Sequence, residues 1–156
     1  MAEPERDDAD VIGRLLMRVY EIHERVIARG GGGLEGLRDA ALLHAAVARP
    51  FATFGVVKLS STDFDKAAAL FHALIKSHPF TDGTKRTAFA AAVYFLHERG
   101  YTLQRPFLKD EIIRFCVGLA EEGQRFAEGK LVAVQTIRQI AEWFKGLVAM
   151  PASEET

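Results

Sequence analysis

One stretch of ten residues, 78–87, gathers side chains that together suit chemistry on phosphate groups. The imidazole of His78 ordinarily gains or loses a proton near neutral pH, so this residue is a candidate general base. Asp82 offers the hard carboxylate oxygens that magnesium prefers. Gly83 allows a tight turn and lets a ligand approach bare backbone. The stretch therefore indicates phosphoryl or nucleotidyl transfer, with His78 as the catalytic residue and Asp82 as the metal ligand.

The second half of the stretch predicts an anion site at the start of a helix. An apolar-rich segment begins at Thr84, so the free N–H groups of its first turn should point back toward the loop. Lys85 and Arg86 add two positive charges in that turn. Gly83, Thr84, Lys85 and Arg86 are therefore the candidate nucleotide-binding residues. A purely structural interpretation makes Lys85 and Arg86 solvated surface charges, but it leaves the assembly of complementary groups unexplained.

Helical periodicity predicts an all-α fold that positions this stretch. Apolar residues recur at helical spacing in six segments, and the predicted helices cover residues 8–29, 38–48, 62–77, 84–99, 107–122 and 126–148. We expect a compact bundle of about six or seven helices around a central helix that starts near Thr84. Phe80 should anchor the loop in the core, so that His78 and Asp82 keep their positions. Residues 53–57 form the only plausible extended piece.

The bulk properties predict one ordinary globular domain over residues 1–156, with flexible tails at 1–7 and 150–156. Apolar residues make up 49% of the chain and charged residues 26%, and the net charge is -1. That charge gives no overall attraction to nucleic acid or to an anionic membrane, so we expect no direct nucleic-acid partner. No apolar run is long enough to span a bilayer. A single cysteine and an acidic N-terminus favour a cytoplasmic protein.

The stretch also resembles the signature of the Fic/Doc family, His-x-Phe-x-Asp/Glu-Gly-Asn-Gly/Lys-Arg. The sequence departs from that signature at Thr84, where the family has Asn, and it matches at His78, Phe80, Asp82, Gly83, Lys85 and Arg86. Lys85 stands where Fic proteins usually carry Gly, and in this it is similar to the Doc (death-on-curing) toxin branch of type II toxin–antitoxin systems. The upstream run over residues 36–55 is similar to Doc proteins as well. The resemblance covers about residues 20–101.

The resemblance to the Doc branch implies a kinase-like transferase that uses ATP and Mg²⁺. It implies that the γ-phosphate faces His78 and that the acceptor is a hydroxyl of a protein, with elongation factor Tu as the expected target. Two alternatives remain. A Fic-type enzyme would transfer AMP instead, because the nucleotide would lie the other way round. An attenuated or inactive antitoxin-binding protein is the other alternative, because the short hydroxyl of Thr84 replaces an amide and is also a common helix N-cap.

The resemblance also implies how such an activity is restrained. Some Fic proteins carry an inhibitory helix with the pattern Ser/Thr-x-x-x-Glu-Gly/Asn. The nearest run here, residues 124–129, has Gln where a hydroxyl residue belongs. We therefore expect a separate antitoxin, similar to the Phd type, whose helix fills a groove. In Fic-like proteins the connection corresponding to residues 51–61 holds a flap that pairs with the target peptide.

Overall fold

Five α-helices account for most of the described chain. The computed structural model describes residues 6–29, 36–51, 53–54, 57–58, 62–103 and 132–149. The helices are α1 (Arg6–Arg29), α2 (Ala40–Ala48), α3 (Asp63–Ser77), α4 (Thr84–Glu98) and α6 (Val132–Leu147). A short 3-10 helix, η1 (Arg49–Phe51), continues from α2.

The all-α prediction is confirmed, although the described residues hold fewer helices than the six or seven predicted. The predicted helix at 107–122 lies outside the described residues, as do the predicted C-terminal tail and the first part of the last predicted helix. In the N-terminal tail predicted at 1–7, residues 1–5 also lie outside, whereas Arg6 and Asp7 already belong to α1. The first four helices begin and end at or close to the predicted residues, because their apolar spacing and end signals are local.

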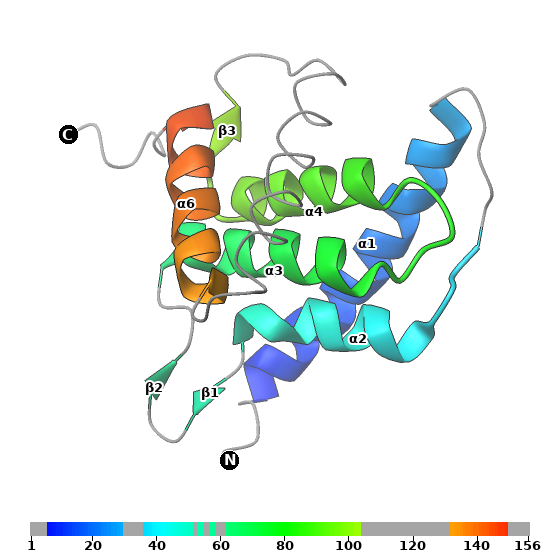
Figure 1. Ribbon diagram of the computed structural model, residues 1–156, viewed down its shortest axis with the longest axis horizontal. Coiled ribbons are helices and arrows are strands. Elements are labelled where there is room, and N and C mark those ends of the chain that lie inside the picture. The colour runs from blue at the N-terminus through cyan, green and yellow to red at the C-terminus, as the bar shows by residue number, and fades with distance from the viewer. Residues whose placement is uncertain are drawn as a thin grey trace.

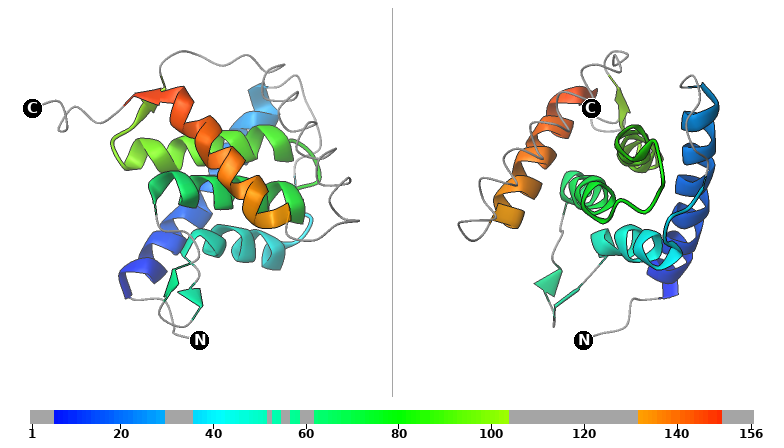
Figure 2. Two further views of the ribbon diagram at one scale, coloured as in Figure 1. Left: turned by 60° about the vertical axis from the view of Figure 1, so that its left-hand side comes forward. Right: turned by 45° about the vertical axis from the view of Figure 1, so that its right-hand side comes forward.

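The pair α3 and α4 occupies the middle of the bundle, and the six residues between them form the loop of interest. The chain reverses through this loop at one edge of the molecule (Figure 1). Helices α2 and α6 pack on α3, whereas α1 packs on α4 and α2. Figure 2 shows α1 and α6 on opposite sides of the central pair. Helix α3 therefore shares with α4 the central position that the sequence predicted for α4.

The central helices bury several alanines as well as large aromatic rings. Alanines let α3 and α4 approach closely, and five of them have no exposed surface: Ala67, Ala68, Ala88, Ala91 and Ala92. Larger rings fill the space beyond them. Phe71 of α3 meets Phe144 of α6 edge to face, with ring centroids 5.7 Å apart. Burial of such rings contributes about 1.5–3 kcal/mol each, which fixes α6 against the pair.

Two of the helices begin with side-chain caps. Asp39 accepts hydrogen bonds from the backbone N–H groups of Ala41 and Leu42 at the start of α2. Thr62 and Asp65 form a reciprocal capping box at the start of α3. These caps satisfy donors that would otherwise lack partners, so both helix starts are set locally.

Two short pairs of strands complete the described structure. Strand β1 (Thr53–Phe54) pairs antiparallel with β2 (Val57–Lys58), so the single extended piece predicted at residues 53–57 is replaced by parts of two short strands. Strand β3 (Thr102–Leu103) pairs antiparallel with β4 (Val148–Ala149), and so ties the end of α4 to the end of α6. Within the described residues, no helix combines the length and the apolar character that crossing a membrane requires.

Candidate active site

The loop between α3 and α4 is defined by two residues in the left-handed region. His78 ends α3 with φ 48° and ψ 59°, and it is the only residue other than glycine with positive φ in the described part of the chain. Gly83 precedes α4 with φ 74°. A side chain in the left-handed region costs free energy, so surrounding contacts must hold His78 there. The His78 side chain itself is exposed to solvent.

Arg38 supplies those contacts from the segment that leads into α2. Its Nε donates to the carbonyl oxygen of His78 and its Nη2 to that of Ser77, each at 2.8 Å. The backbone N–H of Arg38 donates to Pro79 O at 2.7 Å, and Thr81 N–H donates to Gly36 O at 3.2 Å. The segment therefore lies along the loop as a short antiparallel bridge, and it fixes the conformation from which His78 projects.

Phe80 anchors the middle of the loop, as the sequence predicted. Its side chain has no exposed surface and stacks on the imidazole of His23, with centroids 3.9 Å apart and planes 7° from parallel. His23 belongs to α1 and is itself buried, with 2% of its surface exposed. No local pattern in the sequence indicates that this part of α1 meets the loop.

The first turn of α4 presents its backbone N–H groups without a side-chain cap. The N-cap position is occupied by Gly83, which has no side chain to cap the helix. No acidic residue lies in the first turn. The interpretation of Thr84 as the N-cap is therefore wrong, because Thr84 is the first helical residue. Its side chain is buried, and its hydroxyl donates back to Phe80 O over a long 3.5 Å. The N–H groups of the first turn and the helix dipole favour an anion at this end of α4.

The structure brings the candidate residues to one edge of the bundle. His78 and Asp82 are both exposed on the loop, and Lys85 is exposed on the first turn of α4. Arg86 is half-buried, and its Nη1 approaches Val26 O at 3.5 Å. The site thus offers an exposed imidazole, an exposed carboxylate and an uncapped helix end that carries two cations.

The chain is similar in sequence to known proteins of one family. The model of the Fic/DOC family matches residues 16–96, which include α2, α3, the loop and most of α4. The chain belongs to the Fic/DOC family. It is 46% identical to "Toxin Doc" of Mycolicibacterium smegmatis (strain ATCC 700084 / mc(2)155) over 94 residues, which cover 58% of this chain and 72% of that protein. No solved structure matches the chain significantly.

The donor set of this Fic/DOC site fits a magnesium ion that is shared with phosphates. No group of three or more His, Cys, Asp or Glu side chains that could hold a metal occurs among the described residues. A cation at Asp82 would therefore take its other oxygens from phosphate and water. Magnesium is commonly bound in that way, because it keeps several waters and needs only one or two carboxylates.

Two other histidines in this Fic/DOC chain lie outside the site. His44 is exposed on α2, and His72 is half-buried on α3. Burial lowers the pKa of the His72 imidazole below its ordinary value, and the nearby charges of Lys76 and Arg49 lower it further. The lowered pKa of His72 therefore reflects its surroundings on α3 and is unrelated to the loop.

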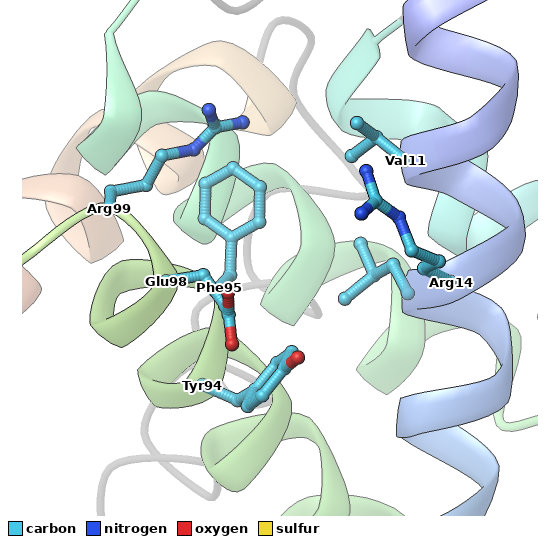
Figure 3. Close-up of a pocket in the computed structure, with 7 residues that line it drawn as sticks. Val11, Arg14, Tyr94, Phe95, Glu98 and Arg99 are labelled. Carbon is cyan, nitrogen blue, oxygen red and sulfur yellow. The ribbon is translucent and has the colours of Figure 1, made fainter.

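A separate cavity lies near the opposite end of α4 from the loop. It has a volume of about 230 Å³ and is lined by residues of α1 such as Arg14, by residues of α4 such as Tyr94, and by Arg99, which directly follows α4. Figure 3 shows these side chains around the space between the two helices. The guanidinium of Arg99 already lies 4.7 Å from the Phe95 ring centroid and 3.6 Å from Asp63. Because it lies at the end of α4 away from the loop, the cavity is no part of the candidate active site.

Proposed function

We propose that this protein is a Doc-like toxin that transfers the γ-phosphoryl group of ATP to a hydroxyl of a protein, with elongation factor Tu as the target. The observation that carries the proposal is the loop itself, where an exposed His78 and an exposed Asp82 flank the buried Phe80 beside the uncapped start of α4. Membership of the Fic/DOC family and the similarity to a protein named Toxin Doc support it.

In the proposed reaction, the acceptor hydroxyl gives its proton to the His78 imidazole while its oxygen attacks the γ-phosphorus. The bond from that phosphorus to the bridging oxygen breaks, and ADP leaves with the electron pair. The first-turn N–H groups of α4 and the cations of Lys85 and Arg86 hold the phosphates. Magnesium held by Asp82 would neutralise the charge that develops on the transferred group.

Lys85 favours phosphoryl transfer over AMP transfer. It is exposed on the first turn of α4, where a glycine would leave open space against the helix end. A bulky cation there disfavours the nucleotide pose that presents the α-phosphate to His78. We therefore expect ATP to lie with its γ-phosphate nearest His78.

Intact mass spectrometry tests this assignment directly. Elongation factor Tu incubated with the protein, ATP and Mg²⁺ should gain the mass of one phosphoryl group, whereas an AMP-sized adduct would contradict the kinase assignment. Lys85→Gly should lower phosphorylation by about tenfold or more, because both the charge and the bulk are lost. Lys85→Gln is the matched control for bulk, and it should keep phosphoryl transfer as its only reaction, at a reduced rate.

A second candidate, an attenuated toxin, is favoured by the position of Thr84. Its hydroxyl donates to Phe80 O within the loop, so it is not offered to a phosphate in the way that the amide of the family's Asn would be. Under this candidate the protein binds its antitoxin but modifies its target slowly.

Replacing Thr84 by Asn measures how far Thr84 limits the rate. If the amide donor is what the site lacks, turnover should rise by up to about a hundredfold, a fraction of what one transition-state donor contributes. The melting temperature should fall only slightly, because the bond from the Thr84 hydroxyl to Phe80 O that is lost is a long one. Equal turnover by both proteins would contradict attenuation and show that the backbone N–H groups suffice.

The proposed partners follow from the same resemblance. A separate antitoxin of the Phd type, with a helix that fills a groove, would restrain the toxin. Residues 124–129, the run nearest to an internal inhibitory helix, lie outside the described residues. We place the protein in the cytoplasm, where elongation factor Tu acts, and we propose no direct nucleic-acid partner.

A further inference from the structure

The ring of His23 contacts the backbone of the loop at Asp82, and this contact has no part in the proposed reaction. Its Nε2 lies 2.6 Å from the backbone carbonyl oxygen of Asp82. A carbonyl oxygen can only accept a hydrogen bond, so Nε2 must carry the proton and donate. Both groups belong to segments that are far apart in the sequence, since 59 positions separate them.

Helix α1 also packs against the start of α4. A Cβ atom added to Gly83 would lie 3.1 Å from Ile27 Cδ1 and 3.3 Å from Val26 Cγ1, which is tighter than ordinary contact. The side chain of Arg86, in the first turn of α4, approaches the carbonyl oxygen of Val26, which also belongs to α1. The second half of the loop is therefore placed by α1, whereas the first half is placed by Arg38.

We infer that His23 is a positioning residue, which sets the place of Asp82 and of the α4 start through the hydrogen bond from its Nε2 to the Asp82 carbonyl oxygen. The inference rests on the proposed function for its effect on catalysis, because Asp82 and the α4 start are the parts that would hold magnesium and phosphate. The backbone position of His78 depends on Arg38 instead. Loss of the His23 bond should therefore weaken nucleotide binding more than it slows the chemical step.

Two substitutions of equal length separate this role from simple packing. His23→Gln keeps an N–H donor at about the position of Nε2, whereas His23→Met has the same length and no donor. A packing role favours Met, because an amide is costlier to bury in the core. A positioning role favours Gln. The same pair at His44, exposed on α2, serves as the control and should change neither measurement.

Hydrogen exchange and kinetics give the two measurements. In His23→Met, amides of residues 81–86 should exchange roughly tenfold faster, because a buried carbonyl has lost its donor. The KM for ATP should rise about tenfold, while kcat changes by less than about threefold. His23→Gln should stay close to the unmodified protein in both respects. Equal loop exchange in the two variants, or faster exchange in Gln than in Met, would overturn the inference.

A third measurement needs no substitution and no nucleotide. With histidine labelled by ¹⁵N, nuclear magnetic resonance of the unmodified protein should show His23 Nε2 protonated, with a slowly exchanging proton. An unprotonated Nε2 in the folded protein would overturn the inference even if both variants failed to fold. Failure of the unmodified protein to bind ATP would contradict the proposed function alone, because the exchange and resonance results would still decide the role of His23.

Discussion

Replacing His78 by Ala is expected to lower the rate of target phosphorylation by about two to four orders of magnitude, the usual contribution of a general base. ATP affinity should change little, because the proposed phosphate contacts come from α4 and Asp82 rather than from His78. Single-turnover kinetics should show the loss, and calorimetry should show the retained affinity. Toxicity in a bacterial host should largely disappear as well.

A second variant is needed because the backbone at His78 has a positive φ, which Ala does not favour. Both His and Ala carry a Cβ atom, so Ala inherits the cost of φ 48°. Asn tolerates the left-handed region better and has an amide that cannot act as a base. His78→Asn should therefore be as inactive as His78→Ala and at least as stable. His44→Asn on the exposed face of α2 is the matched control. Full activity in either His78 variant would contradict the assigned base.

Replacing Asp82 by Asn is expected to lower phosphorylation by about two orders of magnitude or more, since a bound metal contributes several kcal/mol to the transition state. The change keeps the shape of the side chain and removes its charge. The carbonyl that accepts from His23 belongs to the backbone, so that bond remains and the loop should stay folded. The loss should arise from weaker binding of magnesium with the nucleotide.

Calorimetry with and without magnesium isolates that cause. ATP affinity of the unmodified protein should increase when Mg²⁺ is added, and that increase should be largely absent in Asp82→Asn. Without Mg²⁺ the two proteins should bind ATP about equally. Glu24→Gln, on an exposed position of α1, controls for loss of one negative charge. An unchanged magnesium effect in Asp82→Asn would show that the metal is held elsewhere.

Local sequence patterns predicted the first four helices and contained the signature of the family to which the chain belongs. Helix α3 follows from its apolar spacing and from the capping box at Thr62 and Asp65. The burial of Phe80 was expected for an aromatic residue that follows Pro79 at a helix–helix corner. The candidate residues were found together because they are neighbours in the chain, and a short loop needs no tertiary contact to keep neighbours close.

Tertiary structure alone decided how the loop is held and what Thr84 does. Arg38 lies 40 positions from His78 and His23 lies 59 positions from Asp82, and no spacing rule links residues so far apart. Thr84 is a typical N-cap residue by type, yet Gly83 takes that position, because a positive φ beside Val26 and Ile27 suits glycine. Helical periodicity arises from bonds within four residues, whereas these contacts arise only when α1 and the segment before α2 pack against the loop.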